Sequence, residues 1–185
     1  GAPHLVVGGG AKRFDGTREP DFHKLGAALD RVKALAEARG LRAHYHPHLS
    51  TIVEGPAEVA KSFDLTGIDF CPATAHLAAA GGDPAQLIRD HAARITYVHL
   101  KQVDRAIRAR VAEEKLGFPP AVRLGVMVEP PLGDPDMPSL LAALAGLDRD
   151  LYCIVEQDLY PCDWDKPLPI ATRTYDYFKS CGMKV

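Results

Sequence analysis

Short apolar runs along the chain alternate with segments whose apolar residues recur every three or four positions. In the segment 21–39 these positions are Phe22, Leu25, Leu29, Val32 and Leu35, a spacing that predicts an amphipathic helix, which Gly40 would end. The predicted strands are 4–7, 41–46, 68–71, 95–100 and 151–155, with a short strand-like stretch at 123–128. The predicted helices are 21–39, 57–63, 83–93, 105–115, 139–145 and 168–181.

This alternation predicts parallel strands joined by helices. Most of the predicted strands are apolar on both faces, which is typical of a buried parallel sheet. Two α/β architectures fit, a doubly wound sheet and a (β/α) barrel. No G-x-G-x-x-G fingerprint follows a strand. A complete eight-unit barrel needs roughly 250 residues. On the barrel reading, we expect residues 1–185 to form a single domain with about five of the eight β/α units.

Composition narrows the classes of partner. The chain of 185 residues is 46% hydrophobic, which suits one soluble domain, and its net charge is −2. It has no block of Lys and Arg, so nucleic acid is not an expected partner. It also lacks the run of about 18 apolar residues that a membrane helix needs. The four cysteines form no C-x-x-C pair, so we expect no disulfides and a reducing, cytoplasmic setting.

Candidate chemistry gathers where the predicted strands end, which is the active-site edge in both architectures. The polar residues there are His46, His48, Glu54, Thr74, His76, His99, Lys101, Glu156, Gln157 and Asp158. Two carboxylates with a histidine suit Mn²⁺, Co²⁺ or Mg²⁺ better than a structural zinc site, which favours cysteine.

Each of these residues also has a purely structural interpretation. A single histidine at a strand end is more often a hydrogen-bonded loop residue than a ligand. Glu54 would also stabilise the start of the following helix. Glu156 is harder to explain structurally, because it follows the apolar run 152–155 and is costly to bury unpaired. Cys71 and Cys153 lie in apolar runs and are expected to serve as packing residues.

Four segments resemble motifs of one known family, in the same order and over nearly the whole chain. Residues 46–54 resemble H-P-H-x-G-T-x-V-E, and residues 73–84 resemble D-T-G-H-L-x-x-A-G-G-D-P. Residues 97–101 resemble the first part of H-V-H-L-K-D, and residues 154–158 resemble V-V-E-Q-D. These are motifs of the inosose dehydratases and related sugar phosphate isomerases/epimerases. The resemblance implies a xylose isomerase-like TIM barrel, of which this sequence is the C-terminal portion.

The resemblance also implies one divalent metal ion, Mn²⁺ or Co²⁺ by preference, with Mg²⁺ or Zn²⁺ as alternatives. Carried over by position, the metal ligands are Glu54, His99 and Glu156. The family's fourth ligand, an aspartate, aligns with Ala73, so that donor is missing. Two further departures are Ala75 in place of glycine and Gln102 in place of aspartate.

The activity implied is proton abstraction next to the ketone of a sugar or inositol derivative, as a lyase or as an epimerase or isomerase. The expected catalytic residues are Glu54, Glu156, His76 and Lys101, and the expected substrate-binding residues are His46, His48 and Gln157. The alternative is a non-catalytic homologue, inactivated at Ala73, that acts as a binding or complex subunit. An abasic-site endonuclease of related fold is disfavoured by the slightly acidic charge. We expect a second copy or a second chain to complete the barrel, since exposed sheet edges are a liability.

Overall fold

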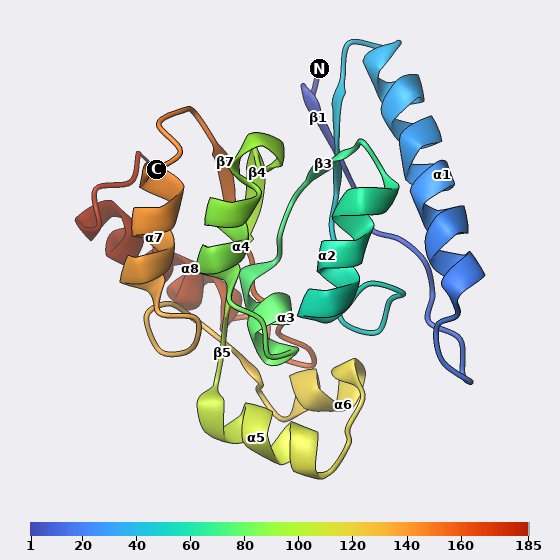
Figure 1. Ribbon diagram of the computed structural model, residues 1–185. Coiled ribbons are helices and arrows are strands. Elements are labelled where there is room, and N and C mark those ends of the chain that lie inside the picture. The colour runs from blue at the N-terminus through green and yellow to red at the C-terminus, as the bar shows by residue number, and fades with distance from the viewer. Residues whose placement is uncertain (185) are drawn as a thin grey trace.

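The computed structural model describes residues 1–184 as an α/β fold (Figure 1). The strands are β1 (His4–Val7), β2 (Arg42–Tyr45), β3 (Asp69–Phe70), β4 (Tyr97–Leu100), β5 (Gln102–Val103), β6 (Met127–Val128) and β7 (Tyr152–Val155). The helices are α1 (Glu19–Glu37), α2 (Pro56–Leu65), α3 (Thr74–Ala79), α4 (Pro84–Asp90), α5 (Arg105–Glu113), α6 (Phe118–Arg123), α7 (Met137–Ala145) and α8 (Pro167–Ser180), with a short 3-10 helix at Ala92–Arg94. The predicted parallel α/β fold is confirmed.

The order of the strands distinguishes the two architectures that fit the sequence. Strands β1, β2 and β3 pair in parallel, and β4 pairs in parallel with β7. Parallel bridges from Phe70 to Ile95 and from Ala73 to His99 join β3 to β4. The five parallel strands therefore lie in chain order, whereas a doubly wound sheet reverses its order at a switch point. This arrangement is that of consecutive units of a barrel.

Helices cover the outer side of the strands. In Figure 1, α1 and α2 lie beside β1–β3, while α4, α7 and α8 lie beside β4 and β7. Between them and the strands is a core that includes Tyr45, Phe70, Val98 and Leu100, all fully buried. The helices α5 and α6 form a separate layer beyond the carboxyl ends of the strands (Figure 1). Side chains at those ends are consequently enclosed between the sheet and this layer.

Several sequence predictions about local structure were wrong or incomplete. Helices α3 and α6 and strand β5 were not predicted. The stretch 123–128 is not one strand, because α6 continues to Arg123 and only Met127–Val128 is extended. Gly125 has a φ of +83° between those two elements, a conformation that interrupts a strand. Strand β7 is not buried on both faces, since Tyr152, Ile154 and Val155 are exposed.

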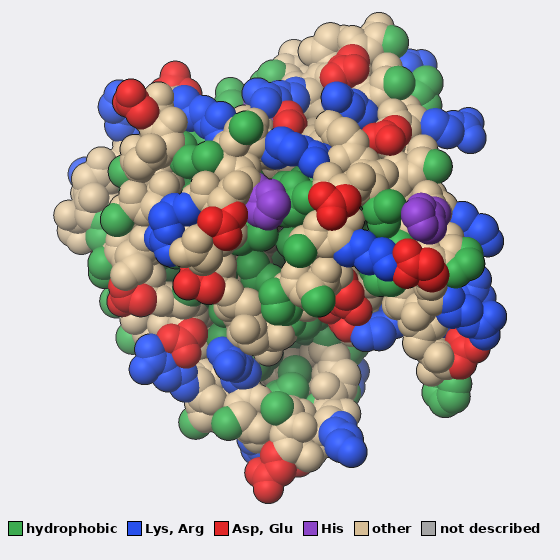
Figure 2. All heavy atoms as spheres, viewed as in Figure 1, with side chains coloured by type: hydrophobic (Ala, Val, Ile, Leu, Met, Phe, Trp, Pro, Cys, Tyr) green, Lys and Arg blue, Asp and Glu red, His purple; other side chains and the backbone are tan. Residues whose placement is uncertain are grey.

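The surface carries both signs of charge. On the face shown in Figure 2, Lys and Arg side chains interleave with Asp and Glu side chains over most elements. Within residues 1–184, no helix has the length and apolar character required to span a bilayer. All four cysteines are free thiols.

Candidate active site

Lys101 is the central charge of a polar cluster at the carboxyl ends of the strands. It directly follows β4, and only 1% of its surface is exposed. Its Nζ lies 2.6 Å from Glu156 Oε2 and donates to Asp158 Oδ2 at 2.9 Å and to His76 Nε2 at 3.2 Å. The Thr74 hydroxyl bonds both the carbonyl and the amide of Lys101. A buried cation is therefore held rigidly against two carboxylates.

His99 and Glu156 come from neighbouring strands and touch. His99 Nδ1 donates to Glu156 Oε2 at 2.7 Å. Burial by itself would raise the pKa of Glu156, but hydrogen bonds from His99 and Lys101 outweigh burial and hold this pKa well below its usual range. Glu156 is thus an ionised carboxylate at neutral pH.

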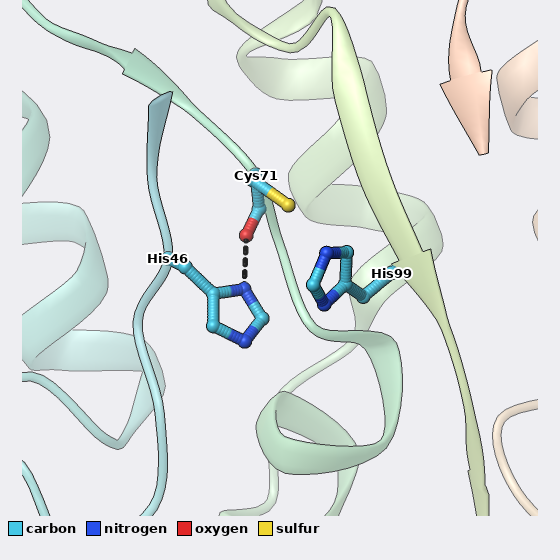
Figure 3. Close-up of side chains that lie close together, drawn as sticks. All are labelled: His46, Cys71 and His99. Carbon is cyan, nitrogen blue, oxygen red and sulfur yellow. Dashed lines mark hydrogen bonds between the residues drawn. The ribbon is translucent and has the colours of Figure 1, made fainter. Parts of the chain in front are cut away.

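A second histidine and a thiol lie against His99. His46 follows β2 and Cys71 follows β3, and His46 Nδ1 donates to the carbonyl oxygen of Cys71 at 2.9 Å. Figure 3 shows the rings of His46 and His99 facing each other, with the Cys71 sulfur on the side of His99 and the second ring nitrogen of His46, Nε2, pointing away from the sulfur. One ligand atom from each of the three residues lies within 4.8 Å of the others. This spacing is compatible with a shared metal ion.

His48 and His76 extend the cluster towards α6. Their ring centroids lie 3.7 Å apart, and Phe118 packs edge-on against both rings. With His46 they form a second group whose ligand atoms lie within 4.8 Å of one another. His76 is 2% exposed, and its Nδ1 has no hydrogen-bond partner among the described residues. The structure thus brings together His46, His48, His76, His99, Lys101 and Glu156, six of the residues proposed from the sequence.

Glu54 does not join either group of ligand atoms. Its carboxylate forms an ion pair with Lys12 and accepts a hydrogen bond from the backbone N–H of Ser50. Ala73 is buried and pairs with His99 in the backbone, but its methyl side chain supplies no donor. Of the metal ligands carried over from the resemblance, His99 and Glu156 are in contact, and Glu54 is engaged elsewhere.

The two glutamines next to the cluster hold the segment between β5 and α7. Gln157 Nε2 donates to the carbonyl of Met127 at 3.3 Å, away from the buried cation. Gln102 is 1% exposed, and its Nε2 donates to the carbonyls of Gly133 and Pro135 while its Oε1 accepts from the N–H of Gly133. Gln102 is therefore fully used in anchoring this turn.

Two acidic or nucleophilic groups at the site had no role assigned from the sequence. Asp158 accepts a hydrogen bond from Lys101, and Cys71 lies close to His46 and His99. The sequence held a signal for the position of Asp158, because residues two apart on an extended chain share a face and Asp158 is two residues after Glu156. Cys71 is likewise two residues before Ala73, the position of the expected aspartate ligand. Because its neighbours in sequence are apolar, Cys71 was interpreted as a packing residue.

Burial keeps the interior histidines neutral. It lowers the pKa of His46 to about 4 and, with Lys101 nearby, that of His76 to about 2. It also lowers the pKa of His44 to about 4, with His4 contributing. His44 is fully buried on β2 below His46 and outside the polar cluster. Neutral imidazoles retain a lone pair, which is the form that accepts hydrogen bonds or binds metals.

We expect His44 to make the fold sensitive to mild acid. The unfolded chain protonates this histidine near its ordinary value of 6.5, while the folded chain resists protonation down to about 4. Stability contributed by the neutral form is present above 6.5 and decreases as pH falls below it. When the pH falls from about 7.5 to about 5.5, the unaltered chain should lose more unfolding free energy than His44→Gln does. The expected difference between the two losses is about 1 kcal/mol. Urea titrations at both pH values measure this difference.

The matched control is His23→Gln on the exposed side of α1, which should leave the pH dependence unchanged. Equal pH dependence in the unaltered chain and the His44 variant would contradict the prediction.

Comparison with known proteins agrees with this architecture. Residues 1–181 match the family described as xylose isomerase-like TIM barrel. The chain is 29% identical to an inosose dehydratase of Clostridium perfringens over 172 residues, 90% of this chain and 58% of that protein. It is 30% identical to an inosose dehydratase of Bacillus thuringiensis over 164 residues, 87% of this chain and 55% of that protein. The chain thus spans a little over half the length of these relatives.

Solved structures show the same fold at lower identity. The probable 3-DHS dehydratase AsbF from Bacillus anthracis superposes with a TM-score of 0.74 at 13% identity, covering 96% of this chain and 63% of that one. The IOLI protein, solved with a bound zinc atom, superposes with a TM-score of 0.71 at 15% identity, covering 98% of this chain and 64% of that one. An L-ribulose 3-epimerase has a TM-score of 0.69 at 15% identity, covering 94% and 60%. From the match over residues 1–181, this chain belongs to the xylose isomerase-like TIM barrel family.

Proposed function

We propose that this chain carries the catalytic cluster of a metal-dependent lyase or isomerase that removes a proton next to the ketone of a sugar or inositol derivative. The observation that carries the proposal is the buried Lys101 ammonium held against Glu156 and Asp158 beside His76. The similarity to inosose dehydratases, at 29% to 30% identity, favours dehydration over epimerisation.

The residues of the cluster have complementary roles in this reaction. Glu156 accepts the proton from the carbon next to the carbonyl, and the electron pair of the broken C–H bond forms the enediolate. Lys101 faces the developing negative charge, where a fixed buried cation acts most strongly. When substrate hydroxyls replace the hydrogen bonds to Glu156, its pKa rises and it becomes a better base.

The outcome depends on what leaves the enediolate. Loss of a β-hydroxyl gives dehydration, and return of the proton to the other face or to the neighbouring carbon gives epimerisation or isomerisation. His48 and the neutral His76 bind substrate hydroxyls. A cavity of about 310 Å³ under α5 and α6 is lined in part by Glu54, Arg108 and Phe118, and Phe118 is the lining residue that also packs against His48 and His76. That volume is at the lower end for small-molecule sites, which suits a monosaccharide.

A divalent ion at this site would polarise the carbonyl and hydroxyl oxygens as a Lewis acid. Two groups of donors have the spacing that such an ion needs, one with His46, Cys71 and His99 and one with His46, His48 and His76. Glu156 lies next to His99 but in neither group, Glu54 pairs with Lys12, and Ala73 has no donor. The resemblance of the sequence favours Mn²⁺ or Co²⁺, whereas the structurally similar IOLI protein was solved with a bound zinc atom. The apolar residues exposed on β7 support a second copy or a second chain as partner, because such a chain would cover them. A cytoplasmic setting stays a prediction.

The test is exchange of the carbon-bound proton with solvent. The full chain, with Mn²⁺ or Co²⁺ added, should incorporate deuterium from D₂O into an inosose or a ketose, observed by NMR. Exchange reports proton abstraction whether or not a hydroxyl leaves. Glu156→Gln should abolish it, because an amide accepts no proton at neutral pH, while the exposed Asp165→Asn should retain it. Exchange at the full rate in Glu156→Gln would contradict the proposal.

A non-catalytic subunit is the second candidate, and Ala73 is the observation in its favour. On that reading, the unaltered chain gives no exchange with any substrate or ion, and Ala73→Asp restores both metal binding and exchange. Exchange by the unaltered chain would exclude it.

A further inference from the structure

We infer that Phe118 determines the size of the substrate, because its ring is the wall between two cavities and limits the site to a single unsubstituted sugar or inositol ring. The inference rests on the proposed function for the class of substrate, and it adds the residue that sets specificity. Its observations are the linings of the two cavities and the contacts of the Phe118 ring.

Two cavities meet at Phe118. The first, of about 310 Å³, is the one under α5 and α6. The second, of about 460 Å³, is lined by α6 and by residues 157–160, which follow β7. Within residues 1–184, the two linings have Phe118 alone in common. The second cavity reaches the catalytic cluster, because its lining residue Asp158 accepts a hydrogen bond from Lys101 Nζ at 2.9 Å.

The Phe118 ring is held in place from two directions. Phe118 is the first residue of α6, and Pro119 and Pro120 follow it in the first turn, where their fixed φ angles suit the start of a helix. On the side of the cluster, the Phe118 ring packs edge-on against His48 at 5.0 Å and 90° and against His76 at 5.1 Å and 67°. The wall is therefore part of the ordered site.

The place of this wall has a consequence for the ligand. The proposed function assigns His48 and His76 to substrate hydroxyls, so a bound ring lies close to the Phe118 ring. A bulky substituent on the side of the ligand that faces Phe118 would collide with the phenyl group. Without the phenyl group the two cavities become one space, and the same substituent can extend across the former wall.

Phe118 also has a packing role. It lies with Ile107 and Val111 against a smaller apolar cluster that includes Ala121 and Met127. Loss of packing alone would weaken the binding of all inositols alike, whereas loss of a wall favours the substituted ones. A comparison between ligands therefore separates the two roles.

Myo-inositol and its mono-O-benzyl ethers are the probes. They carry no ketone, so calorimetry measures their binding without turnover. The unaltered chain, with Co²⁺ added, should bind myo-inositol at least about tenfold more tightly than any of the ethers, since a small misfit in a closed pocket costs about this much. In Phe118→Ala at least one ether should gain about tenfold in affinity, because its benzyl group occupies the space of the lost phenyl group, and myo-inositol should change less.

The matched control is Ile107→Ala. Ile107 packs on the same apolar cluster as Phe118 but lines neither cavity, so the ratio of the affinities should stay as in the unaltered chain. Phe118→Leu keeps much of the apolar volume and should give an intermediate ratio. It keeps the test open if Phe118→Ala does not fold, which circular dichroism reports.

Equal affinity of the unaltered chain for myo-inositol and its ethers would overturn the inference, and so would failure of all these probes to bind. An unchanged ratio in the folded Phe118 variants would overturn it as well. None of these results depends on catalysis. A shifted ratio without deuterium exchange of an inosose or a ketose would contradict the proposed function and leave size selection by Phe118 supported.

Discussion

Lys101→Met should lower kcat/KM for deuterium exchange by a factor on the order of 10² to 10³. A methionine fills much the same volume but carries no charge, so the enediolate forms with no cation facing it. Removing one pre-positioned electrostatic partner costs roughly this much in other enzymes. Lys101 is 1% exposed, so water cannot readily take its place. The measurement is the rate of exchange at saturating and at limiting substrate.

The pH profile of the same variant separates electrostatics from simple damage. The Lys101 ammonium is one of the groups that hold the pKa of Glu156 low. Its removal should move the acidic limb of the profile to higher pH. Lys24→Met, on the exposed face of α1, should change neither the rate nor the profile. A folded Lys101 variant that keeps the full rate would contradict the role assigned to this cation.

Phe70→Ala should lower the free energy of unfolding by about 3 to 5 kcal/mol, as for other fully buried phenylalanines. The Phe70 ring stacks on Phe63 at 3.8 Å between centroids and meets Tyr45 edge-on at 5.6 Å. No solvent reaches it. The truncation leaves a cavity between β2, β3 and α2, measured by urea denaturation.

A loss of this size is a large share of the roughly 5 to 15 kcal/mol that holds a typical domain folded. Phe70→Leu, which keeps most of the volume, provides a folded intermediate case. Phe14→Ala is the control, because Phe14 is fully exposed and surface changes usually stay within about 0.5 kcal/mol. An equal loss in the Phe14 and Phe70 variants would show that the core assignment is wrong.

The sequence predicted those elements whose periodicity is long or whose boundaries carry turn residues. Helix α1 repeats its apolar face over five turns, and its predicted range differs from the observed one by two residues at each end. Helix α4 begins as predicted, with the Asp83 side chain accepting from the N–H of Gln86 at 3.0 Å. Helix α3 escaped prediction because it has only six residues, TAHLAA, which are buried nearly all round and show no amphipathic period.

For the site, the rule that chemistry gathers at strand ends placed His99, Lys101 and Glu156 together correctly. The same rule also placed Glu54 in this cluster, whereas the Glu54 carboxylate pairs with Lys12, which lies 42 residues away in sequence. A contact between side chains on two distant loops leaves no trace in local spacing. Cys71 is the opposite case, since its apolar neighbours in sequence gave no indication that two histidines from other strands would converge on it.

The departures from the family's motifs at Ala73 and Gln102 differ in how easily a substitution could reverse them. A carboxylate at position 73 needs only space and a positive charge nearby. Gln102 is different, because its amide gives two hydrogen bonds to the turn at Gly133 and Pro135. An aspartate accepts hydrogen bonds but donates none, and it is shorter, so Gln102→Asp would leave both carbonyls without their partner. The conformation of this turn therefore depends on the amide, and an aspartate at position 102 would require a differently built loop.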